Sequence, residues 1–208
     1  MSNTSPRFSL PGQWGRVDLA TEASSRRSIR RLVNDVVGNV DQLATLRADL
    51  RTRFQAAADP AREGGATSMF VAIELAKGIP LPAWAVVFEP EIESTDFDAL
   101  GLSDLKTFLE QGITTTDPAV TSADVSGLAI QAVRHSWRRT AQLDPSNEDT
   151  KTEMLEVDYW LAAANPNRIA MITFSTGYAE FEEQMLALFD AVISTIRWEA
   201  PQPQPVAH

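Results

Sequence analysis

The fold of this chain is decided by two strand-like runs, GLAIQAVRHSWRRTAQL at residues 127–143 and TEMLEVDYWLAAAN at residues 152–165, joined by the polar stretch DPSNEDT at residues 144–150. Both runs are longer than an average strand. An Asn-Pro-Asn turn leads from the second run to a third strand at residues 168–175, and three sequential strands joined by short turns predict an antiparallel meander. An amphipathic pattern at residues 179–195 predicts a helix that closes the domain.

Helical and strand-like patterns are both present upstream of the meander. Apolar residues at spacings of three and four predict one long helix over residues 24–58, capped by Ser25 and ended by Asp59-Pro60, with Gly38-Asn39 favouring a kink or break inside it. Further elements are expected as strands at residues 8–10, 14–19, 67–77 and 83–88 and as a shorter helix at residues 96–111. The predicted fold class is therefore α+β, an antiparallel β-sheet with long strands flanked by helices.

The length and composition indicate one domain. The chain has 208 residues, 44% of them hydrophobic, which suffices for one buried core. A single domain is expected over residues 1–199, followed by a disordered tail rich in Pro and Gln at residues 200–208. No run of eighteen apolar residues occurs, so no membrane span is predicted. The first ten residues lack the pattern of a signal peptide, and a cytoplasmic location is expected.

The charge of the chain is acidic and uneven. A formal net charge of −10 disfavours binding to nucleic acid, which needs a basic surface. Residues 1–63 nevertheless hold ten Arg against seven acids, whereas the remainder holds eight Lys or Arg against 21 acids. A cluster of Arg26, Arg27, Arg30 and Arg31 is read either as a solvated helix face that pairs with the acidic remainder or as a phosphate or partner site. The preference for Arg over Lys is typical of GC-rich genomes, such as those of actinobacteria.

Residues that usually carry catalysis are scarce. The chain has no Cys and only two His, His135 and His208, and the second lies in the predicted tail. No HExxH, GxSxG, dinucleotide-binding or phosphate-loop motif occurs. The acids between Glu89 and Asp98 lack the spacing of a calcium loop, which favours a solvated loop over a cation site. No catalytic residue, metal site or cofactor is therefore predicted, although carboxylates from distant segments could still meet in space.

The two long strands also predict a surface. Facing residues of an antiparallel pair have a constant index sum, and parity decides which residues share a face. A turn centred near residue 147 predicts three facing pairs, Arg138 with Glu156, Ser136 with Asp158, and Arg134 with Trp160. A slip by two residues would keep the faces and change the partners. The candidate partner-binding surface on this face consists of Arg134, Arg138, Glu156, Asp158 and Trp160.

The opposite face of the two strands is predicted to be core. It would carry the residues Val133, His135, Trp137, Val157, Tyr159 and Leu161. In this setting His135 is read as a buried structural histidine rather than a general base, because neither a nucleophile motif nor a second His within the fold accompanies it. Most tryptophans are expected in the core, and Trp160 is the one expected at a groove or a partner surface.

The order of the predicted elements resembles a known family. The chain opens with Leu10-Pro11-Gly12-x-Trp14, continues with a hairpin and the meander, and closes with the pattern Ser194-x-Ile196. In these features it resembles the PsbP-like α/β/α sandwich superfamily, which includes the photosystem II extrinsic protein P, Ran-binding Mog proteins, actinobacterial LpqN-type lipoproteins and chaperones of some type VI secretion effectors. The resemblance covers residues 8–198, and the long helix at residues 24–58 departs from it. It implies non-catalytic binding through the sheet face or its edges.

Three functional hypotheses follow from the sequence. The first is a non-catalytic interaction domain, an accessory or chaperone-like partner of a bacterial secretion or toxin system, whose partner is another protein such as a secreted effector or a secretion component. That partner would dock on the sheet face or in a groove against the Arg-rich helix. The second is a small-molecule-binding or enzymatic domain with a cavity between sheet and helices. The third is a self-assembling structural subunit, a homo-oligomer.

Overall fold

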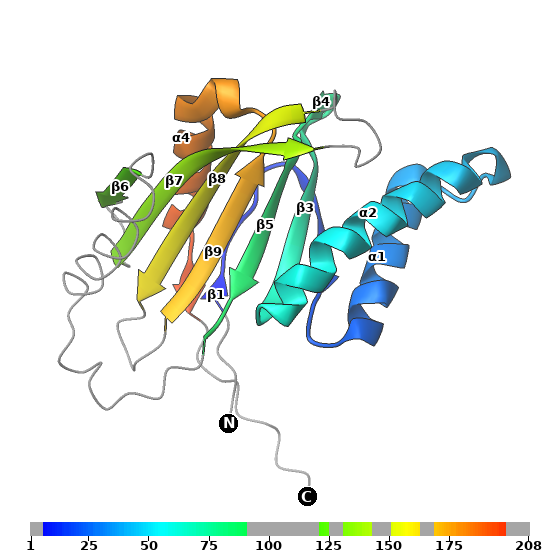
Figure 1. Cartoon of the computed structure of the whole chain (residues 1–208), viewed down its shortest axis with the longest axis horizontal. Coiled ribbons are helices and arrows are strands. Elements are labelled where there is room, and N and C mark those ends of the chain that lie inside the picture. The colour runs from blue at the N-terminus through cyan, green and yellow to red at the C-terminus, as the bar shows by residue number, and fades with distance from the viewer. Residues whose placement is uncertain (1–5, 91–120, 125–130, 143–150, 163–168, 199–208) are drawn as a thin grey trace, which may run out of the picture.

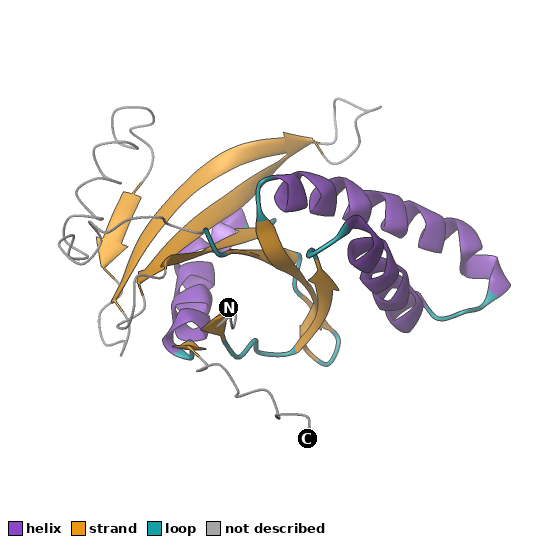
Figure 2. Cartoon of the chain, turned by 90° about the horizontal axis from the view of Figure 1, so that it is seen from below, coloured by secondary structure: helices purple, strands orange, loops and turns teal. Residues whose placement is uncertain are grey.

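The computed structural model describes residues 6–90, 121–124, 131–142, 151–162 and 169–198. In these residues a large antiparallel sheet is flanked by helices on both sides, as Figures 1 and 2 show, which confirms the predicted α+β class. The helix expected at residues 96–111, the turns expected at 144–150 and 165–167, and the tail at 200–208 lie outside the described residues. Among the described helices, none is both long enough and apolar enough to cross a membrane.

The main sheet is built from strands that all pair antiparallel to their neighbours. In spatial order they are β2 (Gln13–Asp18), β3 (Ala66–Ala76), β5 (Ala83–Phe88), β9 (Ile169–Thr176), β8 (Lys151–Ala162), β7 (Gln131–Gln142) and β6 (Thr121–Asp124). The short β4 (Ile79–Pro80) pairs with β3 at the turn between β3 and β5. The β3/β5 hairpin and the β7/β8/β9 meander are thus confirmed.

The first predicted strand is displaced. The structure has β1 (Pro6–Arg7) in place of a strand at residues 8–10, and it pairs with β10 (Arg197–Trp198) in a separate two-stranded sheet. Residues 8 and 9 contact other elements instead of pairing as a strand. The backbone N–H of Ser9 donates to Thr195 Oγ1 over 2.8 Å, and the ring of Phe8 meets Phe70 edge-on with centroids 5.2 Å apart.

The long predicted helix is two helices. They are α1 (Glu22–Val37) and α2 (Ala44–Glu63), joined by a 3₁₀ turn η1 (Asp41–Leu43), and together they form a helical hairpin. The break falls at Gly38, whose φ of 78° suits glycine and whose N–H donates to Asn34 O over 2.8 Å. The predicted cap was wrong, because Thr21 caps α1 and Ser25 is buried inside it.

The predicted end of the long helix, at Asp59-Pro60, was also wrong. Pro60 lies inside α2, which continues to Glu63. A proline removes one backbone donor from a helix, and in the last turn this loss is small because few further bonds depend on it. The ring is exposed to solvent, and the carbonyl of Pro60 accepts the N–H of Gly64 over 2.9 Å, so the final turn closes normally.

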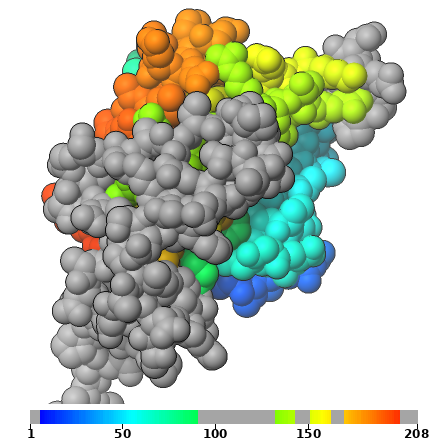
Figure 3. Space-filling view, turned by 60° about the vertical axis from the view of Figure 1, so that its left-hand side comes forward, coloured from blue at the N-terminus to red at the C-terminus, as the bar shows by residue number. Residues whose placement is uncertain are grey.

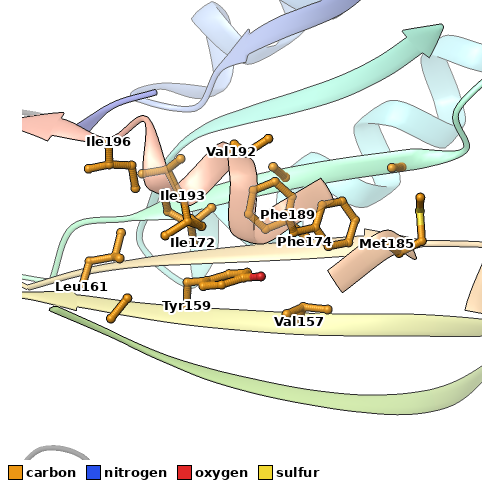
Figure 4. Close-up of a cluster of buried hydrophobic side chains, with 14 of the residues drawn as sticks. Val157, Tyr159, Leu161, Ile172, Phe174, Met185, Phe189, Val192, Ile193 and Ile196 are labelled. Carbon is orange, nitrogen blue, oxygen red and sulfur yellow. The ribbon is translucent and has the colours of Figure 1, made fainter. Parts of the chain in front are cut away.

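The sheet has two faces, which we call the α4 face and the hairpin face. On the α4 face lies α4 (Glu182–Ser194), which follows the 3₁₀ turn η2 (Ala179–Phe181). Figure 4 shows the core between them, where Phe174 stacks on Phe189 with centroids 4.5 Å apart and Tyr159 meets Phe174 edge-on at 5.7 Å. The buried residues around these rings include Val157, Leu161, Ile172, Met185, Val192, Ile193 and Ile196.

On the hairpin face, the helical hairpin covers β2, β3 and β5. Val17, Met69 and Val86 of the sheet are buried against side chains of α1, which include Ile29, Leu32 and Val33. The approach of α1 is close at Gly15, where an added Cβ would lie 2.0 Å from Leu32 Cδ1. A larger residue at this position of β2 would therefore have to displace the buried side chain of Leu32.

Candidate interaction surfaces

The register of β7 and β8 differs by one residue from the predicted one. Arg134 faces Tyr159, His135 faces Asp158, and Trp137 faces Glu156. A shift of one residue moves a strand's side chains to the opposite face relative to its partner. The five candidate residues therefore do not form one surface: Arg134 and Arg138 lie on the α4 face, and Glu156, Asp158 and Trp160 lie on the hairpin face.

The apolar pattern of β8 determines which face of that strand is buried, and it leaves the register with β7 open. Leu155, Val157, Tyr159 and Leu161 all lie on the α4 face and are fully buried. Arg134 and Arg138 of β7 can join that face because α4 supplies acids for both. The prediction sought the partners of these arginines on the neighbouring strand, whereas the main ones are on a helix. The predicted core group of Val133, His135 and Trp137 faces away from Tyr159, although Val133 and His135 are buried.

Arg134 and Arg138 hold α4 on the sheet. Arg138 donates to Glu182 Oε2 over 2.9 and 2.7 Å, and Arg134 forms an ion pair with Asp190. The spacing fits, because four residues along a strand span about 13 Å and eight residues along a helix span about 12 Å. The helix thus runs beside β7, and Figure 3 shows α4 in orange directly against the green to yellow-green atoms of β7.

Both ion pairs belong to local networks. The hydroxyl of Tyr159 donates to Asp190 Oδ1 over 2.6 Å, so Asp190 joins β7 and β8 to the helix. Burial, together with the hydrogen bond to Asp190, raises the pKa of Tyr159 well above its ordinary value. The hydrogen bond to Glu182 raises the pKa of Arg138, which also contacts Glu153 at 3.3 Å. These two arginines are therefore engaged inside the domain.

Glu156 and Asp158 carry a polar network on the hairpin face. Glu156 is buried, and its Oε1 accepts from Arg139 Nε at 2.6 Å and from Ser175 Oγ at 2.7 Å. Asp158 Oδ1 accepts from Thr173 Oγ1 at 2.6 Å. The hydroxyl groups of β9 thus satisfy carboxylates of β8 across the strand pair, as buried polar groups require.

The carboxyl of Asp158 has a shifted titration. Burial raises its pKa to about 6, the hydrogen bond from Thr173 opposes the shift, and the charge of Glu156 adds to it. His135 is its cross-strand neighbour and is buried. Near neutral pH such a carboxyl can take up and release a proton. In the described part of the chain, no group of three His, Asp or Glu side chains is arranged to hold a metal ion.

The sequence did not predict the exposed apolar end of the helical hairpin. Figures 1 and 2 show α1 and α2 extending past the edge of the sheet, so the distal part of their apolar stripe has no strand beneath it. The exposed fractions there are 47% for Val36, 57% for Val40, 37% for Leu43 and 45% for Leu46. We call these four residues the hairpin end. Their spacing in the sequence predicts that they share one apolar stripe. Their exposure follows from the position of the sheet edge, which the spacing does not predict.

A second feature of the helical hairpin is a groove of about 380 Å³ between α1 and α2. It is lined by Arg26, Ile29, Arg30, Arg51, Thr52, Gln55 and Ala56. Two members of the arginine cluster noted in the sequence, Arg26 and Arg30, thus line it, whereas Arg27 and Arg31 are exposed on α1 outside it. We call it the arginine groove.

No protein-family model matches this chain, and no curated protein matches it significantly.

Proposed function

We propose that this chain is a non-catalytic protein-interaction domain whose hairpin end contacts the partner protein. The observation that carries the proposal is the exposure of Val36, Val40, Leu43 and Leu46 together at one end of the molecule. Scattered apolar side chains on a surface are ordinary, whereas a contiguous group marks a surface that another molecule covers. The group lies on one rigid supersecondary element and includes both of its helices and the turn.

The helical hairpin is ordered before any partner arrives. Arg47 donates to Gly38 O over 3.0 Å and to Val40 O over 2.7 Å, which fixes the turn against α2. Arg51 donates to Asn34 Oδ1 over 2.7 Å and joins the two helices. Binding on such an element loses little conformational entropy, so a small apolar contact can give useful affinity.

The net charge of −10 supports a protein rather than a nucleic acid as the partner. The resemblance to PsbP-like proteins supports an accessory or chaperone-like role in a bacterial secretion or toxin system, with a secreted effector or a secretion component as the partner. This narrower assignment depends on the resemblance alone. The hairpin end replaces the sheet face as the proposed docking surface, because Arg134, Arg138 and Glu156 are engaged in ion pairs within the domain.

Crosslinking in the source cell tests this proposal. A photoreactive amino acid is placed at position 40 or 43, and a control is placed at Lys77, which is exposed in the turn after β3. We expect one protein to be captured from positions 40 and 43 and not from 77, and Leu46→Asp to abolish the capture at 43. Capture of only a second copy of this chain would instead support a self-assembling subunit. No capture at either position would reject the proposal.

A second candidate function is favoured by the carboxylates of β8. Glu156 is held by Arg139 and Ser175, whereas the pKa of Asp158 is raised to about 6, and two nearby carboxyls in different environments are a pattern found in acid–base catalysis. This would make the chain a small-molecule-binding or enzymatic domain. Titration of the protein with a metabolite library, monitored by thermal shift, tests it. Any ligand whose stabilisation disappears in Asp158→Asn would support this candidate.

A further inference from the structure

We propose that the arginine groove binds an acidic amphipathic helix of the partner protein, packed between α1 and α2 as a third helix. This inference rests on the proposed interaction function and names the chemistry of the segment that is bound. It is carried by a site separate from the hairpin end, so the two can be tested independently.

The groove presents cationic donors and no carboxylate. Its lining, all within the described residues, includes three arginines, Arg26, Arg30 and Arg51, and no Asp or Glu. Arg30 is exposed, and no ion pair joins it to another described residue. Arg26 pairs with Glu22 at a site where both side chains are more than half exposed, so that bond exchanges readily with another carboxylate.

Arg51 is the third arginine of the lining, and its side chain must turn outward before its Nε can meet a bound carboxylate. Its terminal nitrogen bonds to Asn34, but its Nε is buried and lacks a hydrogen-bond partner. A guanidinium usually uses its fork of donors on a carboxylate, and a buried donor without an acceptor is unfavourable. Neither polar neighbour in the lining accepts from it: Thr52 donates its hydroxyl to Ala48 O, and Gln55 donates an amide N–H to Asp59 Oδ1.

The shape of the groove suits a helix. The buried Ile29 and the small Ala56 also line it. A third helix can pack on two neighbouring helices with its axis about 8–10 Å from theirs. Arg26 and Arg30 are four residues apart, which is one helical turn of about 6 Å. Glutamates four residues apart on the incoming helix have the same spacing, so both pairs can form at once while its apolar residues lie on the exposed Ala56.

The charge of the whole chain favours a short acidic segment over a polyanion. Residues 22–63 hold eight Arg and six acids, whereas the rest of the chain holds ten Lys or Arg and 22 acids. A nucleic acid extending beyond the groove would meet this acidic remainder. Because exposed charges are screened beyond about 8–10 Å at ordinary salt, a helix confined to the groove responds chiefly to the local arginines.

A titration with a designed peptide tests the inference on the full chain. The probe is a 20-residue synthetic amphipathic helix with Glu in pairs four apart beside a Leu and Ala face, and the control is the same peptide with Lys for Glu. We expect the Glu peptide to shift the amide NMR signals of Ile29, Arg30, Thr52 and Gln55. Arg30→Glu should weaken its binding at least tenfold more than Arg31→Glu, an equal charge change on α1 outside the groove.

The neutral variant Arg30→Gln guards against a folding artefact and should lose part of the affinity. Equal binding of the Lys peptide, or shifts only at the hairpin end, would overturn the inference. Tighter, Arg30-dependent binding of a single-stranded RNA would identify a phosphate site instead. If the Glu peptide does not bind while positions 40 and 43 still capture a protein, the acidic helix is wrong and the interaction function stands. If the Glu peptide binds but positions 40 and 43 capture no protein, the hairpin end is not the contact with the partner and the acidic helix stands.

Discussion

The two faces of the sheet are covered in different ways. On the α4 face, a single helix buries Met185, Phe189, Val192 and Ile193, and ion pairs from β7 secure it near both ends. On the hairpin face, the helical hairpin buries only the proximal part of its apolar stripe and extends past the sheet with the rest. The apolar side of α4 is covered within the chain, whereas the helical hairpin leaves part of its apolar stripe exposed to solvent.

The side chains that stabilise the fold are therefore different from those that are exposed and can bind a partner. A side chain that is already packed and paired cannot offer much free energy to a partner, whereas an exposed apolar group on a rigid element can. The α4 layer should therefore respond strongly to substitution in folding experiments and weakly in binding experiments. The hairpin end should show the reverse.

The largest effect on folding is expected from Phe189→Ala. The ring is fully buried and stacks on Phe174, so its removal leaves a cavity, and unfolding should require about 3–5 kcal/mol less. Phe181→Ala is the matched control, because that ring precedes the same helix but is 49% exposed, and its loss should be much smaller. Urea denaturation of both variants measures the difference. Similar losses would mean that α4 is not anchored by its buried face.

The next effect concerns the polar part of the hairpin face. The pKa of Asp158 is about 6 in the folded chain against an ordinary 3.8, so the folded state holds the proton more tightly. The free energy of unfolding then falls as the pH rises from about 4 to 6, because above that range the buried carboxyl carries a charge. Asp158→Asn removes this loss, and the variant should gain on the wild type by about 1–3 kcal/mol between pH 4 and pH 7.5.

Urea denaturation at several pH values measures this gain. Asp49→Asn, on the exposed side of α2, controls for the change in net charge. A constant difference between Asp158→Asn and the wild type over the whole range would show that Asp158 is solvated in the folded protein.

Much of the fold could be predicted because it depends on local patterns. The alternation in β8 and the spacing in α4 identify their own buried faces, since each periodicity is a property of the backbone. The break at Gly38 is also local, because it depends on a backbone angle that glycine accepts. These elements could be predicted without knowing which other elements they pack against.

The candidate surface could not be predicted in this way. Its error was one residue of register between β7 and β8, and in that register the charges of Arg134 and Arg138 are compensated by Asp190 and Glu182, more than 40 residues away. The hairpin end poses a similar problem, because Val36 and Ile29 belong to the same stripe and differ only in whether the sheet extends beneath them. Both depend on tertiary geometry, which no local pattern contains.

A smaller effect should separate the two arginines that hold α4. Among its partners in the described residues, Arg134→Met leaves Asp190 the hydroxyl of Tyr159, and because the Arg134 side chain is 18% exposed, the loss should be about 1–2 kcal/mol. Arg138→Met breaks a pair whose arginine is 44% exposed, and its effect should be clearly smaller. Double-mutant cycles with Asp190→Asn and Glu182→Gln measure the two couplings. Equal couplings would contradict the view that burial decides which pair matters.

The smallest effect on folding is expected at the hairpin end. Val40→Ser combined with Leu46→Ser removes exposed methyl groups, and in a surface position such changes usually stay within about 0.5 kcal/mol. The fold of the helical hairpin should persist because Arg47 still bonds to the carbonyls of Gly38 and Val40, which the substitutions do not remove. If the variant keeps its urea midpoint and loses the crosslinked partner, the unused apolar surface exists for binding. If it loses more than 1 kcal/mol, these side chains stabilise the chain itself, and the contrast between the two faces no longer holds.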